Sequence, residues 1–255
     1  MQPVIYPVNK AKLLAELTEE RFIRKTNKGG NEIYSFNAFN SPNLMKEVGR
    51  LRELTFRTAG GGTGKEVDID PFDVDEQVPY QQLIVWDPKE QEILGGYRYI
   101  LCDNLPLNQE GEPNLATTEL FRFSEAFKKQ YLTKMIELGR SFVQPLYQST
   151  KMGRKSLFAL DNLWDGLGAL TVENPGMEYF FGKVTMYTSF NIEARDMILF
   201  GSTSKIRKDL SSRSLHWKFI LMIINLGKYS AEIIMTRIIE SSLVTSGNME
   251  KISHP

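Results

Sequence analysis

The stretch Met135-Ile-Glu-Leu-Gly-Arg-Ser-Phe-Val143 has the alternating pattern of a β-strand. A basic loop, Lys151-Met-Gly-Arg-Lys155, follows it, and Ser156 then opens a segment with helical periodicity. When a strand leads through a short loop of glycine and cations into a helix, the backbone N–H groups of the first helical turn point outward and can hold a phosphate. The sequence therefore predicts a binding site for a phosphate-bearing donor.

The same strand carries two charged residues, Glu137 and Arg140. They are three positions apart, so in a regular strand they lie on opposite faces of the sheet. One of them can then point at a reacting group while the other pairs across the sheet. Both side chains are costly to bury for packing alone.

Composition narrows the class of protein. The 255 residues include 31 basic and 31 acidic side chains, so no global field favours nucleic acid as a partner. One cysteine, Cys102, cannot form an internal disulfide and is expected to be an inert buried thiol. The N-terminus lacks the pattern of a signal peptide, and the apolar runs are too short to span a bilayer. We therefore expect one compact cytoplasmic domain.

The periodicity of apolar residues predicts the secondary structure. Helical spacing indicates helices over residues 10–22, from Ser41 as a cap with Pro42 in the first turn, over 124–130 and over 156–171. Alternation indicates strands over 31–38, 80–86, 92–101, 135–143 and 177–187. This order predicts an α+β domain, with a mixed, mostly antiparallel sheet and helices on both faces.

Two other segments resemble ligand-binding loops. Ala59-Gly-Gly-Gly-Thr-Gly64 resembles a phosphate cradle, but it follows a helix, so no helix N-terminus faces it and a plain connecting loop is the better interpretation. The acidic run 66–76 lacks the central glycine and terminal glutamate of a calcium loop. Neither His216 nor His254 has a partner at ligand spacing. We expect no metal site.

Several short motifs, taken together, resemble the GNAT superfamily, and within it the long-chain N-acyltransferases: the ornithine or glycine N-acyltransferases called hemolysin-like and the related autoinducer synthases. The matching motifs occur in the family's order between about residues 40 and 200. They are Leu51-Arg52 with Phe56, Asp70-Pro-Phe-Asp73, Ile93-Leu-Gly-Gly-Tyr-Arg98, Glu119-Leu-Phe-Arg-Phe123, Glu137-Leu-Gly-Arg140, Leu163-Trp-Asp-Gly166 and Tyr179-Phe-Phe-Gly182.

The resemblance implies a GNAT-like fold and an activity. Its members move a fatty acyl group from acyl carrier protein, or from coenzyme A, to a small amine. The implied product is an N-acyl aminolipid, with an amino acid such as glycine or ornithine as acceptor. An acyl-phosphopantetheine donor is implied, without a permanently bound cofactor.

Site residues are carried over by position. The resemblance assigns Arg52, Phe56, Asp70, Asp73, Arg98, Glu137 and Arg140 to the acceptor and donor site. The loop 148–156 matches the GNAT pyrophosphate loop, which implies donor binding by Lys151, Gly153, Arg154, Lys155 and Ser156. This loop has a single glycine among cations, and a carrier protein's phosphopantetheine, with one phosphate, asks less of it than coenzyme A does.

The chemistry suggests a role for each charged residue. Acyl transfer to an amine needs a base and a group that stabilises charge on the carbonyl oxygen. We expect Glu137 to be the base, directly or through water, with Arg98 and Arg140 beside it. The alternative is an ion pair that only orders strands. A guanidinium of Arg98 or Arg140 can bind an acceptor carboxylate. Asp70 and Asp73 are either ligands of the acceptor amine or solvated loop acids.

The aromatic residues also have two interpretations. Phe56, Trp86, Phe121, Phe123 and Trp164 can line an acyl tunnel, but rings at strand or helix period are what cores contain. We therefore expect most of them to belong to the core, and we retain Phe123 and Phe56 as candidate substrate contacts.

Residues 201–255 form an atypical tail. Their composition shifts to Ser, Ile and Lys, and 215–226 and 230–243 have the apolar content of helices. A basic, Ile-rich helix can touch a membrane surface. We prefer the hypothesis that a frameshift near Phe200 replaced the family's continuation, so the predicted GNAT-like domain is 1–200. Two functional alternatives stay open for this domain: a short-chain acetyltransferase that uses acetyl coenzyme A, and a domain that binds acyl chains or carrier protein without turnover.

Overall fold

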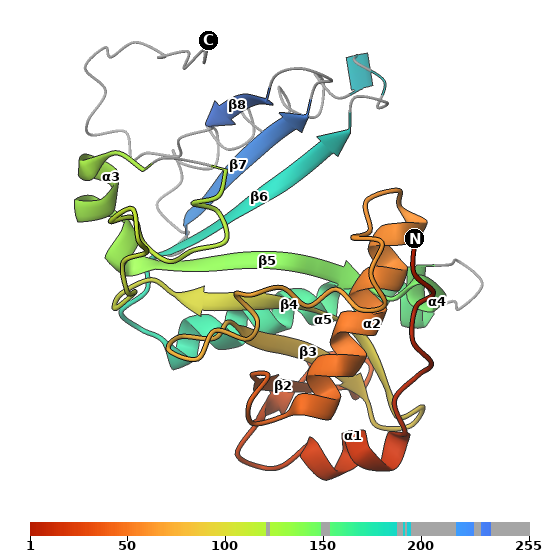
Figure 1. Cartoon of the computed structure of the whole chain (residues 1–255). Coiled ribbons are helices and arrows are strands. Elements are labelled where there is room, and N and C mark those ends of the chain that lie inside the picture. The colour runs from red at the N-terminus through yellow and green to blue at the C-terminus, as the bar shows by residue number, and fades with distance from the viewer. Residues whose placement is uncertain are drawn as a thin grey trace. The chain divides into compact units, whose positions relative to one another are not determined.

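A computed structural model describes residues 1–120, 123–148, 154–187, 191, 193–194, 218–226 and 231–235 (Figure 1). The chain divides into two compact units, Met1–Glu178 and Tyr179–Pro255. Each unit is described by itself. All but one of the candidate motifs lie in the first unit, so its architecture positions the site.

The first unit contains five strands, and each pairs antiparallel with the next along the chain. They are β1 (Phe22–Lys25), β2 (Glu32–Phe36), β3 (Gln81–Asp87), β4 (Glu92–Leu101) and β5 (Met135–Val143). The predicted hairpin over residues 80–101 is confirmed to within a residue or two. In this order β5, which carries Glu137 and Arg140, pairs directly with β4, which carries Arg98.

Helices cover both faces of this sheet, as predicted (Figure 1). The helix α2 (Pro42–Thr58) lies against one face together with α1 (Lys10–Glu16), and α5 (Arg154–Glu173) lies against the other. Three short helical segments complete the unit: α3 (Glu125–Gln130), the 3-10 turn η1 (Leu132–Lys134) and α4 (Pro145–Gln148). The α+β architecture is confirmed.

Strand alternation divides the buried side chains between the two faces. Ile84 and Trp86 of β3 pack with Leu44 and Val48 in the core below α2. Leu83, which alternates with them, faces α5. A Cβ on Gly166 of α5 would lie 2.7 Å from Leu83. Each large apolar side chain buried in this way stabilises the fold by about 1.5–3 kcal/mol.

The start of α2 differs from the prediction. Ser41 makes no side-chain cap, although it is completely buried and Pro42 follows it as expected. The carboxylate of Glu16, at the end of α1, instead accepts hydrogen bonds from the backbone N–H groups of Asn43 (3.0 Å) and Leu44 (2.8 Å). The helix predicted over 10–22 ends early at Glu16, because its last carboxylate serves the next helix and the chain then turns into β1.

The second unit contains three described strands. β6 (Tyr179–Tyr187) pairs parallel with β7 (Lys218–Leu226), and β8 (Ala231–Met235) pairs antiparallel with β7. The expectation of helices over 215–226 and 230–243 is therefore wrong where these strands lie, and the Ile-rich composition of β7 is typical of a strand. Most of the rest of the tail falls outside the described residues. The frameshift stays a prediction, which sequencing of the coding DNA tests: an intact frame in independent isolates contradicts it.

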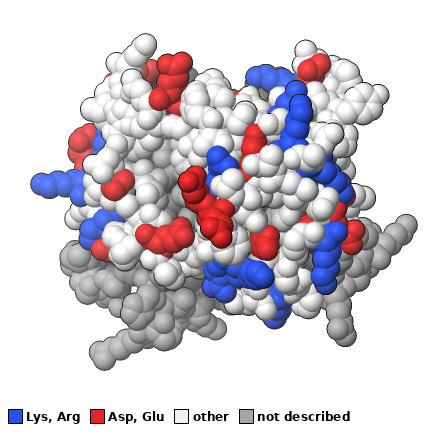
Figure 2. Space-filling model, turned by 90° about the horizontal axis from the view of Figure 1, so that it is seen from below, with Lys and Arg blue, Asp and Glu red and all other residues white. Residues whose placement is uncertain are grey.

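Surface charge agrees with the balanced composition. On the face shown in Figure 2, acidic and basic side chains are intermixed. Within the described part of the chain, no helix combines the length and apolar character that a membrane span requires.

Candidate active site

A β-bulge in β5 determines where Arg140 lies. Gly96 of β4 is opposite Phe142, while Arg98 is opposite Gly139, so β5 holds one more residue than β4 in this interval. Arg140 is the residue that adapts: its φ is 51°, in the left-handed region that non-glycine residues rarely adopt. This conformation costs about 1–2 kcal/mol. Such strain persists only where the surrounding contacts maintain it.

The contacts of Arg140 show what maintains it. Its Nη2 lies 3.3 Å from Asp70 Oδ2, and its Nε lies 3.1 Å from Asp68 Oδ2. Nη1 of Arg98 donates to both oxygens of Asp70 at 2.7 Å. Arg140 and Arg98 therefore share one carboxylate and lie on the same face of the sheet.

Glu137 belongs to this face as well. It pairs in register with Ile100, which is two positions along β4 from Arg98. The prediction that Glu137 and Arg140 lie on opposite faces is therefore wrong. The physical reason is the bulge, since one extra residue between positions 137 and 142 reverses the side on which the following side chain points.

Three aspartates and three arginines form a continuous network below this face. Arg52 of α2 binds Asp73 through two hydrogen bonds of 3.1 and 3.2 Å, and its Nε donates to Asp68 at 3.2 Å. Arg98 also reaches Asp73 at 3.3 Å. The charges balance within the network, which offsets the cost of burying side chains as inaccessible as Arg52 and Asp73.

The network controls the protonation of its members. Burial alone would raise the pKa of Asp73, but the guanidinium groups of Arg52 and Arg98 hold the pKa below its usual value. Burial would lower the pKa of Arg98, and Asp73 and Asp70 raise it above the ordinary value instead. Asp73 and Arg98 are therefore both charged at neutral pH.

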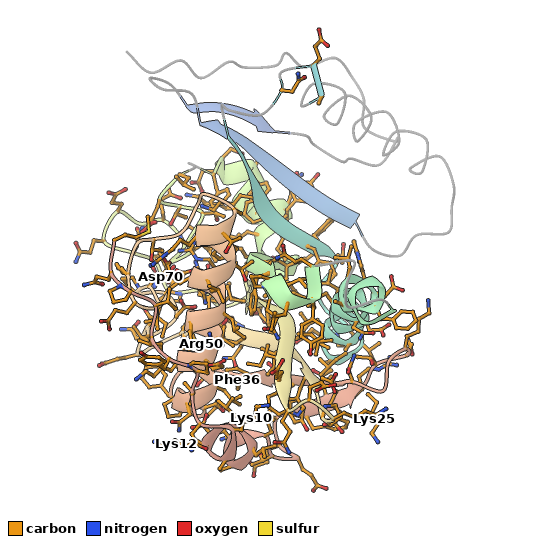
Figure 3. All side chains as sticks on the ribbon, turned by 90° about the vertical axis from the view of Figure 1, so that its right-hand side faces the viewer. Lys10, Lys12, Lys25, Phe36, Arg50 and Asp70 are labelled. Carbon is orange, nitrogen blue, oxygen red and sulfur yellow. The ribbon has the colours of Figure 1, made fainter. Side chains whose placement is uncertain are left out.

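Two members of the network reach its solvent-exposed edge. The side chain of Asp70 is 20% exposed and that of Arg140 is 29% exposed, whereas those of Arg52 and Asp73 are completely buried. Asp70 lies on the loop that runs beside α2 (Figure 3). The loop lies close there because Gly49 of α2 faces it: a Cβ at that position would be 2.8 Å from Ile69. Solvent thus meets a carboxylate and a guanidinium side by side.

Glu137 is buried, with 2% of its surface exposed, and two hydroxyl groups donate to it. Tyr80 Oη lies 2.9 Å from Oε1, and Thr117 Oγ1 lies 2.7 Å from Oε2. Sequence analysis missed both partners. Burial and the charge of Glu137 raise the pKa of the Tyr80 phenol well above its usual value. Burial also raises the pKa of the Cys102 thiol.

Tyr80 connects Glu137 to the network. Its ring lies under the guanidinium of Arg98, whose central carbon is 4.8 Å from the ring centroid. This cation–π geometry lies within the range in which the attraction is significant. The structure therefore brings Glu137, Arg98, Arg140, Asp70 and Asp73 together in one assembly, with Arg52 beneath it.

The other predicted residues are placed less closely. Phe56 packs, partly buried, against the core under α2, and Phe123 is 5% exposed and stacks on Phe127 at 5.1 Å. Lys151 and Gly153 lie outside the described residues. Arg154, Lys155 and Ser156 lie in the first turn of α5, so the helix begins two residues earlier than predicted, within the basic segment.

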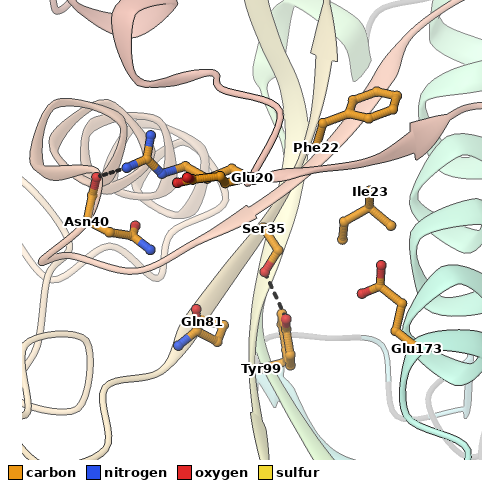
Figure 4. A pocket seen from close by; sticks show the side chains of 9 residues that line it. Glu20, Phe22, Ile23, Ser35, Asn40, Gln81, Tyr99 and Glu173 are labelled. Carbon is orange, nitrogen blue, oxygen red and sulfur yellow. Dashed lines mark hydrogen bonds between the residues drawn. The ribbon is translucent and has the colours of Figure 1, made fainter.

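A cavity of about 420 Å³ lies elsewhere in the first unit (Figure 4). Glu20, Phe22, Gln81, Tyr99 and Glu173 are among its lining residues, and none of the predicted site residues contributes to it. Tyr99 donates to or accepts from Ser35 at 2.8 Å there. Within the described residues, no group of three or more His, Cys, Asp or Glu side chains could hold a metal ion.

Comparison with known proteins places this geometry in a family. Residues 51–156, which hold the bulge and all members of the network, match the Acetyltransferase (GNAT) domain. The chain is 58% identical over 200 residues to "Glycine N(alpha)-acyltransferase" of Phocaeicola vulgatus and 59% identical over 200 residues to the protein of the same name from Bacteroides thetaiotaomicron. The chain carries a GNAT domain and is similar over 200 residues to N-acyltransferases. The resemblance seen in the motifs is confirmed.

The alignments with these relatives cover most of this chain but a smaller share of the relatives themselves. Each alignment covers 78% of this chain, but the chain spans only about three fifths of the relatives, 61% and 59% of their lengths. No solved structure matches the chain. The GNAT domain identifies the fold of the matched region.

Proposed function

We propose that this GNAT protein is an N-acyltransferase that moves an acyl group from a phosphopantetheine thioester to the amine of glycine. The relatives named glycine N-acyltransferase support the acceptor. The observation that carries the proposal is the exposed edge of the network, where the Asp70 carboxylate and the Arg140 guanidinium are 3.3 Å apart.

The exposed edge is complementary to a small amino acid. Glycine at neutral pH carries an ammonium and a carboxylate separated by one carbon, and Asp70 and Arg140 offer the opposite charges at solvent-accessible positions. A guanidinium can bind both oxygens of a carboxylate. Because Arg52 and Asp73 are buried and bound to each other, they support these side chains and do not contact the acceptor in this proposal. The proposal therefore assigns Asp73 and Arg52 a supporting role, and not the role of substrate ligands that the motifs predict.

Acyl transfer requires the ammonium group of glycine to lose two protons: one goes to a base and leaves the neutral amine, and the other goes to the departing thiolate. The amine nitrogen attacks the thioester carbonyl, the C–N bond forms, the C–S bond breaks and the thiol leaves. Glu137 takes the amine proton in this proposal, and its low exposure favours transfer through a water molecule over direct contact. Arg98 lies beside Glu137, with the ring of Tyr80 under its guanidinium. In this proposal it stabilises the negative charge that develops on the carbonyl oxygen of the thioester.

The proposal also concerns the identity of the acyl donor. The helix α5 begins at Arg154, and the N–H groups of its first turn can hold a phosphate. This supports either acyl coenzyme A or acyl carrier protein. With a long acyl chain, the product is an N-acylglycine lipid.

Incubation of the purified protein with thioesters and amino acids tests the proposal. Palmitoyl coenzyme A, palmitoyl carrier protein and acetyl coenzyme A are each supplied with glycine or ornithine, and products are identified by mass spectrometry. We expect N-palmitoylglycine from the wild type and about a hundredfold less from Glu137→Gln. Glu178→Gln is the matched control, since Glu178 is half-exposed and pairs with Lys134.

The other outcomes select the alternatives. Acetylated amines alone would indicate a short-chain acetyltransferase. Binding of a palmitoyl thioester with no product from any combination would indicate an acyl-binding domain without turnover. N-acylornithine in place of N-acylglycine would change the acceptor and keep the reaction.

A further inference from the structure

Two hydroxyl groups from distant parts of the chain hold the Glu137 carboxylate. Tyr80 directly precedes β3, and Thr117 lies in the loop between β4 and α3. They are 57 and 20 residues from Glu137 in sequence, and each donates to a different carboxylate oxygen, at 2.9 and 2.7 Å. Both oxygens are therefore fixed in space, so rotation of the carboxylate about its last bond is restricted.

The direction of the Tyr80 hydrogen bond is determined by a third group. The backbone N–H of Ala116 donates to Tyr80 Oη at 2.9 Å. Since an N–H group can only donate, the phenol hydrogen is available for Glu137, and Tyr80 acts as the donor. Ala116 and Thr117 are neighbours, so one loop segment orients the tyrosine and also supplies the second hydroxyl.

This loop segment is itself firmly placed. Leu115 is completely buried, and the N–H of Thr118 donates to its carbonyl at 3.1 Å. Asn114 donates to Asp75 at 3.1 Å, which ties the loop to the acidic segment that carries Asp70 and Asp73. The loop that supplies Thr117 and orients Tyr80 is thus held by its buried Leu115 and by a hydrogen bond to the acidic segment.

We propose that Tyr80 and Thr117 are positioning residues that fix the Glu137 carboxylate in the orientation used for acyl transfer. The inference rests on the proposed function. A glutamate side chain has three rotatable bonds, and a base that is displaced by about 1 Å can lose about a hundredfold in rate.

The test compares matched variants in the acyl transfer assay. Tyr80→Phe and Thr117→Val each remove one donor with little change in shape. Tyr97→Phe and Thr171→Val are the controls, because the hydroxyl groups of Tyr97 and Thr171 donate to the backbone carbonyls of Leu163 and Gly168. Thr117→Ser restores a hydroxyl at the tested position.

We expect Tyr80→Phe and Thr117→Val to lower kcat by about tenfold or more, with KM for glycine changed by less than about twofold. Thr117→Ser should recover most of the loss, and the controls should stay close to the wild type. Wild-type kcat in both donor variants would overturn the inference. Equal losses in the controls, or no recovery with Thr117→Ser, would also overturn it, because the effect would then be a general one of packing.

A stability measurement separates failure of this inference from failure of the proposed function. If the wild type transfers no acyl group, the proposed function fails, and thermal unfolding still tests the contact. In a double-mutant cycle of Tyr80→Phe and Glu137→Gln, we expect the losses of Tm to be clearly less than additive. Additive losses would show that Tyr80 and Glu137 do not interact, and would overturn the inference by themselves.

Discussion

Glu53 and Glu137 are both nearly inaccessible to solvent, but different groups hold them. Glu53, on α2, accepts hydrogen bonds from the backbone N–H and hydroxyl of Thr63 (2.9 and 2.6 Å), from the N–H of Gly64 (2.9 Å) and from Arg57 (2.7 Å). All three partners lie within 11 residues in sequence. Although burial opposes it, these donors lower the pKa of Glu53 to about 2.

The surroundings of Glu53 explain the glycine-rich loop. Its amides bind a carboxylate of the same chain, which supports the interpretation of residues 59–64 as a connecting loop. A Cβ on Gly62 would be 2.8 Å from Arg57 Cβ and 2.9 Å from Glu53 Oε1, so glycine lets the loop fold back on α2. In the region from Glu53 to Gly64, the Glu53 carboxylate thus holds the glycine-rich loop against α2.

Glu137 differs in the origin of its donors. Two neutral hydroxyl groups come from remote segments, and an ionic network with an exposed edge lies beside it. Comparison of the two glutamates teaches that burial alone does not separate a structural carboxylate from a candidate base. The identity of the donors, and their distance in sequence, does so.

The largest effect is expected where the network is opened from beneath. Arg52→Met leaves Asp68 and Asp73 without the guanidinium that binds both. Removing one partner of a buried ionic cluster costs about 3–5 kcal/mol, because the remaining charges stay buried. Urea unfolding measures the change. A loss smaller than that of Glu53→Gln would contradict the central place of Arg52 in the network.

Glu137→Gln should separate activity from stability. We expect kcat to fall about a hundredfold, equivalent to about 2.7 kcal/mol of transition-state stabilisation. Glu53→Gln should leave kcat almost unchanged. Parallel measurements of kcat and Tm on both variants test this contrast, and equal losses of kcat would remove the distinction between the two glutamates.

Glu53→Gln should destabilise the fold in a pH-dependent way. At neutral pH, the amide that replaces the Glu53 carboxylate keeps one oxygen and turns the other acceptor into an NH2 donor, so at least one donor that faced the carboxylate loses its acceptor, at a cost of about 1–3 kcal/mol. Since the pKa of Glu53 is about 2 when folded and 4.5 ordinarily, its contribution is complete above pH 4.5 and is lost as the pH falls toward 2. Urea unfolding of both proteins between about pH 2 and 7 measures the difference. A difference in unfolding free energy that stays constant over this range would contradict the role of the Glu53 carboxylate in holding the loop.

The smallest effect concerns two non-glycine residues with positive φ in the described part of the chain, Gln91 (55°) and Arg140 (51°). Gln91 is exposed in the turn between β3 and β4, so Gln91→Gly should relieve strain and stabilise the fold by about 1 kcal/mol. Arg140→Gly relieves the same strain but loses the contacts with Asp68 and Asp70, so we expect no net gain and a loss of activity. Equal stabilisation by both substitutions would show that those contacts contribute nothing.

Local patterns predicted most of the elements. The hairpin, β5 and α5 were placed within two residues of their bounds, because alternation and helical spacing are properties of neighbouring residues. The strand β1 was missed because it has four residues and is mostly exposed, which leaves no alternating pattern. Ser41 was chosen as a cap in place of Glu16, because a cap supplied from another helix has no local signal.

The site was predicted in part for the same reason. Glu137, Arg98, Asp70 and Arg140 were assigned from motifs, and the structure does bring them together. The shared face of Glu137 and Arg140 was not foreseen, because a bulge depends on the register with β4 and not on β5 alone. Tyr80 and Thr117 were not foreseen either, since no spacing rule connects them to Glu137.

The sequence by itself determined the resemblance to GNAT proteins and the α+β class, and it predicted the charged residues of the candidate site, because motifs and periodicity are carried by short stretches. Only the tertiary structure decided which of these side chains are exposed, which face each one occupies and which hydroxyl groups hold Glu137. Pairing between strands and the packing of loops join residues that are tens of positions apart. Those contacts depend on the whole fold, so they leave no pattern in any single segment.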